Sequence, residues 1–209
     1  TMRLTLLLLL LLPCPAFAAE LDVLLVGNSY TSFNGLAGQT RDALEAHPDV
    51  AVARVEAHAP GGVRLPEHLA EADGTNGETQ LRRWLTDYTP GWNVVVFQDQ
   101  SQVPGFYDQD PVFDASAQAF TQLDRLVAAA PGEPATVLYM TWGRRDGDST
   151  NTALFPDFLG MQARLEEGYR RYAAAAERTV YIAPAGLAFQ AVYEAVEGGG
   201  ETPEDAGTC

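Results

Sequence analysis

The stretch Leu21 to Thr31, LDVLLVGNSYT, decides how the rest of the chain is interpreted. Its first half is an almost continuous apolar run that ends at Val26 and is rich in branched side chains. Such a run is typical of a parallel strand that is buried on both faces of a sheet. The run stops at Gly27, so Ser29 lies just past the carboxyl end of the predicted strand.

The position of Ser29 is compatible with a reactive hydroxyl. In open α/β sheets, ligands and reacting groups collect at the carboxyl ends of the strands. Helical periodicity resumes near Gly35, and Ser32 or Asn34 can cap that helix. A hydroxyl between a strand and a helix lies close to backbone N–H groups that can stabilise negative charge. On spacing alone, an equally open alternative is that Asn28 and Ser29 are ordinary turn and capping residues.

Residues 1–18 are predicted to be a cleaved export signal. A positive residue precedes the apolar run from Leu4 to Leu12, and Ala16-Phe17-Ala18 supplies a signal-peptidase site. The run is too short to span a bilayer comfortably. Cys14 raises the alternative of a lipoprotein, but Pro13 stands where a small residue normally precedes a lipidated cysteine. The protein is therefore expected to be secreted or periplasmic.

Composition limits the kind of partner. The 209 residues suit one α/β domain, expected over residues 19–209. A formal net charge of −15 at pH 7 argues against nucleic acid or anionic lipid as a partner. Cys209 is the only cysteine after the predicted signal, which argues against a disulfide framework, a Cys-rich zinc site and a catalytic thiol in the domain. No cofactor is expected, and the sequence does not indicate the oligomeric state.

Strand-like and helix-like segments alternate along the chain. Strands are predicted at residues 21–26, 50–58, 92–97, 136–141 and 179–183. Helices are predicted at residues 36–46, 65–72, 78–88, 114–130, 156–177 and 187–196. This alternation predicts a parallel sheet of five strands covered on both faces, which is a flavodoxin-like α/β fold in three α/β/α layers.

Residues able to take part in catalysis follow four of the predicted strands. They are Ser29 after the first, His58 and Gly62 after the second, Gln98 and Gln100 after the third, and Trp142 after the fourth. In a parallel sheet all of them lie at one edge. A nucleophilic serine needs donors for the developing oxyanion. Gly62 can bring its N–H close to a substrate because it has no side chain, and Gln100, or less readily Gln98, can offer an amide.

These blocks resemble, in order, those of the SGNH (GDSL-type) hydrolase superfamily. GNSYT is similar to the first block, in a variant with GNS in place of GDS, and the Gly61-Gly62 turn is similar to the second. VVVFQDQSQ stands where the third block usually has G-x-N-D, which aligns Gln98 with the glycine and Gln100 with the asparagine. With TW after the fourth strand and the helix containing MQARLEEGYRRYA, the pattern resembles an exported bacterial subgroup over residues 21–196.

The resemblance implies a serine esterase. Ser29 would attack an ester carbonyl, while the N–H groups of Ser29 and Gly62 and the amide of Gln100 would stabilise the oxyanion. The substrate-binding residues are expected to be Asn28, Gln98 and Trp142. The expected substrate is a short acyl ester, such as an acetyl group on a carbohydrate, because export and an acidic surface suit a soluble polymer. A lipase or thioesterase would differ only in the pocket lining.

The last block of the superfamily, D-x-x-H, is missing from the sequence. That block supplies the acid and the base from a loop after the last strand and helix, but nothing in residues 184–209 matches it, and no histidine follows His68. The chain is therefore expected to be truncated before this pair and before the final helix that packs on the sheet. Loss of triad members usually costs several orders of magnitude in rate. His58 and His68 are alternative bases, although a structural role is commoner for such histidines.

Other interpretations stay open. A non-catalytic exported module that binds carbohydrate or acts as a scaffold could keep the fold without the chemistry. Arg144 and Arg145 could grip a substrate carboxylate or belong to a solvated loop. The loop aspartates lack the His or Cys spacing of a metal site. A nucleotide-binding function is disfavoured, because Gly27 to Ser29 is too short for a Gly-rich phosphate loop.

Overall fold

The computed structural model describes residues 19–108 and 111–198 and contains a parallel sheet. Its strands are β1 (Ala19–Val26), β2 (Val50–His58), β3 (Val94–Phe97), β4 (Ala135–Tyr139) and β5 (Val180–Ala183), in the order β2-β1-β3-β4-β5. The predicted α/β fold and five-stranded parallel sheet are confirmed. The predicted export signal and Cys209 lie outside the described residues.

Helical segments connect the strands. They are α1 (Ser29–Ser32), η1 (Phe33–Gly35), α2 (Leu36–Glu45), α3 (Leu65–Ala72), α4 (Gln80–Thr86), η2 (Val103–Phe106), α5 (Pro111–Ala129), α6 (Phe158–Ala175) and α7 (Ala185–Gly198). The turn after Gly27 is thus already helical, which the sequence pattern did not indicate. α4 begins later than predicted because Thr79 caps it, its Oγ1 accepting from Arg82 N at 3.1 Å.

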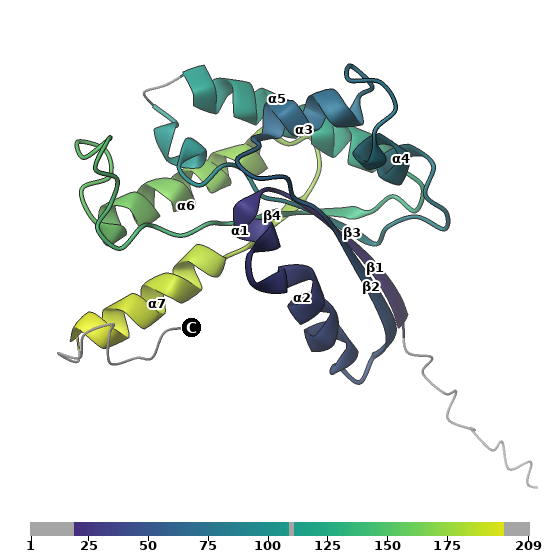
Figure 1. Cartoon of the computed structure of the whole chain (residues 1–209), viewed down its shortest axis with the longest axis horizontal. Helices are drawn as coiled ribbons and strands as arrows, with labels where there is room; N and C mark the ends of the chain where they lie inside the picture. Colours follow the sequence, from purple (N-terminus) through teal and green to yellow (C-terminus); the bar gives the residue numbers. More distant parts are fainter. Residues whose placement is uncertain (1–18, 109–110, 199–209) are drawn as a thin grey trace, which may run out of the picture.

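The main core lies on one face of the sheet. α3, α4, α5 and α6 cover this face (Figure 1). Leu24, Phe97 and Leu138 point into it from three strands, and each is 0% exposed. Phe120 of α5 and Tyr172 of α6 pack against them, with ring centroids 6.0 Å apart. The inward-pointing apolar residues of the strands therefore fill this layer.

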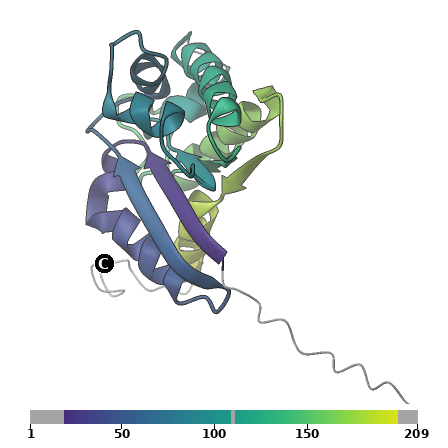
Figure 2. The ribbon, with the colours of Figure 1, turned by 90° about the vertical axis from the view of Figure 1, so that its right-hand side faces the viewer.

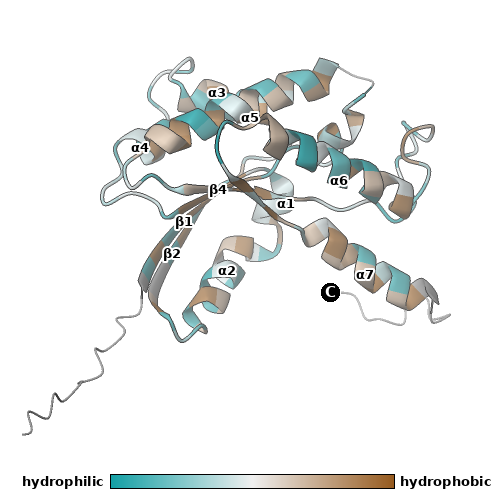
Figure 3. Ribbon diagram, turned by 180° about the vertical axis from the view of Figure 1, so that it is seen from behind, coloured by the Kyte–Doolittle hydropathy of each residue, from teal (hydrophilic) through white to brown (hydrophobic). Residues whose placement is uncertain are grey.

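The opposite face is only partly covered by described helices. α2 packs on β1 and β2 through a smaller cluster around Val23 and Leu25. α7 diverges from α2 below the sheet (Figure 1), and its ribbon carries apolar residues along its length (Figure 3). A groove of about 220 Å³ lies beside α2, over the central strands, and is lined in part by Val96, Val137 and Tyr139. This groove leaves apolar side chains of the central strands without a helix above them.

The strand ends that were predicted to gather catalytic residues lie at one edge. β1 and β2 run side by side in the same direction, with Val26 paired to His58 (Figure 2). Val26 is also paired to Phe97 at the end of β3. The loops after β1, β2 and β3 therefore start next to one another. No described helix is long and apolar enough to cross a membrane.

Candidate active site

Ser29 occupies the first position of α1 and is exposed. Asn28 caps this short helix, because its Oδ1 accepts a hydrogen bond from Tyr30 N at 3.2 Å. Within residues 19–108 and 111–198, no hydrogen bond to the Ser29 hydroxyl is formed. Asn28 therefore takes the capping role and leaves the neighbouring hydroxyl free to meet a substrate.

A buried pair of amides holds the turn that carries Ser29. Gln98 Oε1 accepts from Asn28 N at 3.0 Å and from Thr31 Oγ1 at 2.9 Å, while Gln98 Nε2 donates to Asn28 Oδ1 at 3.1 Å. The exposed fraction is 2% for Asn28 and 1% for Gln98. Both residues were predicted to bind substrate, and the structure places both beneath the turn instead. A side chain at Gly27 would overlap Thr31 Oγ1 and lie 2.6 Å from Gln98 Oε1.

Substitution Gln98→Ala is expected to lower the free energy of unfolding by about 3 kcal/mol, because it leaves buried donors of Asn28 and Thr31 without an acceptor. Urea denaturation followed by circular dichroism measures the change. Gln118→Ala, an exposed glutamine of α5, is the matched control and is expected to change stability by less than about 0.5 kcal/mol. Equal effects of the two substitutions would contradict the role given to Gln98.

Gly62 lies in the turn between β2 and α3, next to the Ser29 turn. Asn28 Nδ2 donates to Val63 O at 3.0 Å, which ties the two turns together. Gly62 is exposed and has a φ of +74°, a conformation that residues with a side chain rarely adopt. The turn is therefore placed where its backbone can approach a group held by Ser29.

Gln100 lies in the loop after β3, and its side chain is engaged within that loop. Its Nε2 donates to Ser101 Oγ at 3.2 Å, and its Oε1 accepts from Gln102 N at 3.2 Å. A role as an oxyanion donor requires the Gln100 amide to exchange its contact with Ser101 for one with the substrate.

Asp99 is a buried carboxylate that the sequence pattern did not single out. It is 0% exposed and accepts hydrogen bonds from Tyr172 Oη at 2.8 Å, Gln100 N at 2.8 Å and Leu65 N at 3.2 Å. Burial raises the pKa of Asp99, and these hydrogen bonds oppose that rise. Asp99 therefore ties the loop after β3 to the start of α3 and to α6. Its only signal in the sequence is a carboxylate directly after a buried strand.

The two histidines near this edge, His58 and His68, contact groups other than Ser29. His68 is 0% exposed, and its Nε2 lies 2.9 Å from Gly27 O. His58 Nε2 lies 2.7 Å from Glu71 Oε2, and the rings of His58 and His68 are 5.6 Å apart. Burial lowers the pKa of His68 to about 4. Neither histidine makes a contact with Ser29 in this structure.

Ser29 opens into a cavity of about 340 Å³ lined by Ser29, Tyr30, Phe33 and Trp142. The rings of Tyr30 and Trp142 are 4.8 Å apart, and Phe33 is 71% exposed. Trp142, which was predicted to bind substrate, is thus a wall of the cavity that contains the nucleophile candidate. Its walls are aromatic, which suits a small apolar group beside the reacting serine.

The described part of the chain contains no group of three or more His, Cys, Asp or Glu residues that could hold a metal ion.

Comparison with known proteins extends these findings. No family model and no curated protein matches the chain. A candidate SGNH hydrolase from Slackia heliotrinireducens is 27% identical, with 83% of each chain covered and a TM-score of 0.63. A DUF4886 family protein from Bacteroides uniformis is 18% identical, with 82% of this chain and 70% of that chain covered and a TM-score of 0.62.

A catalytic mutant of an acetylxylan esterase from Geobacillus stearothermophilus is similar in fold. It is 14% identical, with 85% of this chain and 83% of that chain covered and a TM-score of 0.54. The resemblance that GNSYT and the later strand ends carry in the sequence is thus matched by the arrangement of the strands. The chain has the fold of the SGNH hydrolase superfamily, and the resemblance to that superfamily is confirmed.

Proposed function

We propose that this chain is the body of an exported serine esterase of the SGNH type that hydrolyses short acyl esters. The observation that carries the proposal is the exposed hydroxyl of Ser29 at the carboxyl end of a central strand. This hydroxyl has no hydrogen-bond partner among the described residues and opens into an aromatic cavity. Similarity to SGNH hydrolases supports hydrolysis of an ester.

In this proposal the reaction has two halves. Ser29 Oγ attacks the ester carbonyl carbon, its proton passes to a base, and the alcohol leaves with a proton to give an acyl-serine. Water then attacks the acyl-serine and releases the acid and the free hydroxyl. The N–H groups of Ser29 and Gly62 would face the oxyanion, and Gln100 would add its side-chain amide.

The base and its acid partner are the missing parts. None of the residues that the structure describes forms a hydrogen bond with the Ser29 hydroxyl, and His58 and His68 are engaged elsewhere. We propose that an Asp-x-x-His pair follows in the natural gene and that a helix after it packs into the groove over Val96, Val137 and Tyr139. An apolar sheet face normally requires such a cover.

The proposed substrate is an acetyl ester of a carbohydrate. Three considerations support it: the predicted export signal, the net charge of −15, and the similarity to an acetylxylan esterase. The alternative is an exported module that binds carbohydrate or acts as a scaffold without catalysis, and it predicts that the natural gene also lacks the Asp-x-x-His pair.

Hydrolysis of p-nitrophenyl acetate is the test of this function. The rate is measured for this chain and for a version extended through the following codons of the natural gene. The extended protein is expected to hydrolyse the ester, to unfold at higher urea concentration and to bind less of an apolar dye, because the groove becomes covered. This chain alone is expected to be much slower. A folded but inert extended protein would favour the binding module.

A further inference from the structure

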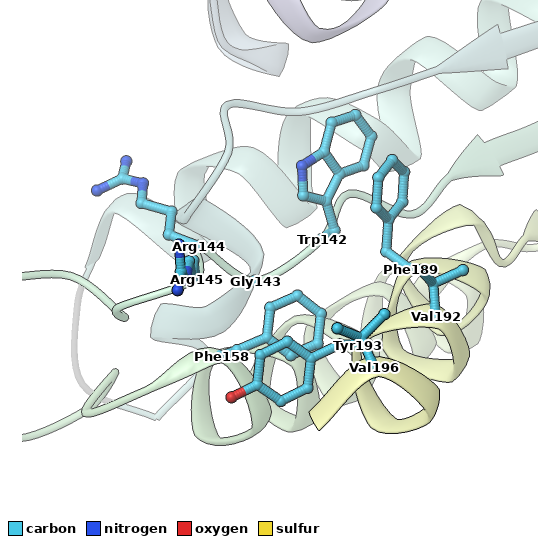
Figure 4. Close-up of a pocket in the computed structure, with 9 residues that line it drawn as sticks. All are labelled: Trp142, Gly143, Arg144, Arg145, Phe158, Phe189, Val192, Tyr193 and Val196. Carbon is cyan, nitrogen blue, oxygen red and sulfur yellow. The ribbon is translucent and has the colours of Figure 1, made fainter. Parts of the chain in front are cut away.

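A second cavity of about 320 Å³ adjoins the Ser29 cavity, and Trp142 lines both. The loop after β4, the start of α6 and one side of α7 form it (Figure 4). The Trp142 ring stands between the two cavities, because it packs on Tyr30 of the Ser29 cavity and on Phe189 of the second cavity. A ligand that occupies both cavities has to pass around this ring. Nothing in the proposed chemistry uses this second space.

Two stacked pairs of aromatic rings form walls of this second cavity. Trp142 stacks on Phe189 with centroids 4.4 Å apart and planes at 24°, and Phe158 stacks on Tyr193 at 4.4 Å and 13°. Figure 4 shows the two pairs on different sides of the cavity. Phe189 is 47% exposed, so its ring is accessible. Flat aromatic walls of this kind accept flat rings better than branched chains.

The two arginines of this cavity differ in what they already bind. Arg144 reaches Ser101 Oγ at 3.2 Å and Asp148 Oδ1 at 3.4 Å, and its side chain extends away from the aromatic rings (Figure 4). Arg145 is exposed and forms no hydrogen bond or ion pair within the described ranges 19–108 and 111–198. Arg145 is thus a local positive charge at the edge of an apolar cavity, without an acidic partner among the described residues, and this local charge can bind an anion. A guanidinium can bind a carboxylate through two parallel hydrogen bonds, in a bidentate geometry.

We infer that this cavity binds a six-membered ring that carries a carboxylate, with a face of the ring against the aromatic walls and the carboxylate on Arg145. If the bound ring is part of the ester substrate, it belongs to the half of the ester that lies on the far side of Trp142 from Ser29. This assignment rests on the proposed esterase function. The same chemistry has two sources, an aromatic acid and a uronic acid. Binding itself does not depend on turnover, so it is tested separately.

The test is calorimetric titration of this chain with benzoate and glucuronate, each beside its uncharged counterpart, benzamide and glucose. At least one carboxylate is expected to bind about tenfold more tightly than its counterpart, and 0.5 M salt is expected to weaken it. Binding of benzoate alone identifies an aromatic acid, and binding of glucuronate alone identifies a uronic acid. Equal binding of charged and uncharged rings, or no binding of either carboxylate at millimolar concentration, overturns the inference.

Variants assign the binding to residues. Arg145→Gln is expected to weaken the carboxylate about tenfold, whereas Arg41→Gln, an exposed arginine of α2 that also has no partner among described residues, leaves it unchanged. Phe189→Ala is expected to weaken both the charged and the uncharged ring, and Tyr181→Ala, which exposes a similar area outside the cavity, is its control. If Arg145→Gln and Arg41→Gln weaken carboxylate binding equally, the assignment of the site to Arg145 is overturned. If this chain binds a carboxylate but the extended protein does not hydrolyse p-nitrophenyl acetate, the inference about the cavity is kept and the proposed esterase function is rejected.

Discussion

Replacing Ser29 by alanine is expected to lower kcat for p-nitrophenyl acetate at least about a thousandfold in the extended protein that carries an acid–base pair. Removal of the nucleophile leaves only the contributions of the oxyanion donors and of substrate binding. KM is expected to change little, because the cavity walls Tyr30, Phe33 and Trp142 remain in place. Initial rates over a range of ester concentrations measure both constants.

The fold is expected to tolerate this change. Ser29 is exposed, and Asn28 rather than Ser29 caps α1. Alanine is a good helix former at such a position, so the free energy of unfolding is expected to change by less than about 0.5 kcal/mol. Ser32→Ala is the matched control, because Ser32 is an exposed serine of the same short helix whose side chain caps nothing.

Two results would contradict the assignment. An extended protein that keeps its rate after Ser29→Ala uses a different nucleophile. Equal losses in Ser29→Ala and Ser32→Ala would mean that α1 is needed for folding or binding rather than for attack on the ester. Circular dichroism of each variant separates a loss of chemistry from a loss of fold.

The fold could be predicted from the sequence because its central strands carry apolar residues on both faces. The four residues that end at Val26 and the four that end at Phe97 are all apolar, which makes the strand pattern clear, and the helices between these strands have apolar faces. The errors are at the ends of helices, because the capping residue determines where a helix begins. The Thr79 cap makes α4 begin at Gln80, two residues after the predicted start, and Asn28 caps α1 in a turn with no helical apolar pattern.

The candidate site was predicted less completely. Residues that follow parallel strands lie at one edge of the sheet, and this rule correctly placed Ser29, Gly62 and Trp142. It could not tell which side chains of a strand-end loop point outward. Gln98 points inward because Asn28 and Thr31 offer it hydrogen bonds, and these partners lie far from it in the sequence. Such long-range pairing leaves no local pattern.

The role of His68 could not be predicted from the sequence either, because its hydrogen-bond partner Gly27 is also far from it in the chain. We expect His68 to make the stability of the protein sensitive to acid. Gly27 O can only accept, so His68 Nε2 carries the proton of the neutral ring and donates to it at 2.9 Å. His68 Nδ1 has no hydrogen-bond partner among the described residues, so a second proton there would be buried and unbonded. His58 on β2 opposes that charge and Glu67 on α3 favours it, but burial is the larger cause and lowers the pKa to about 4.

From this pKa the direction of the pH dependence follows. The unfolded chain takes up the proton near pH 6.5 and the folded chain only near pH 4. The stabilisation is therefore fully present above pH 6.5 and is lost as the pH falls toward 4, by about 3 kcal/mol in all. Urea denaturation at pH 7, 5.5 and 4.5 measures this loss.

His68→Gln isolates the contribution of the ring. A glutamine amide can still donate to Gly27 O but does not titrate, so the variant is expected to lose about 1 to 2 kcal/mol at pH 7 through poorer packing and to show a smaller further loss in acid. His47→Gln, at an exposed histidine, is expected to keep the full acid sensitivity. If His68→Gln and the parent chain lose the same stability between pH 7 and 4.5, other groups cause the effect. Because Gly27 directly precedes the Asn28–Ser29 turn, a confirmed loss would mean that protonation of His68 weakens the support of the candidate nucleophile.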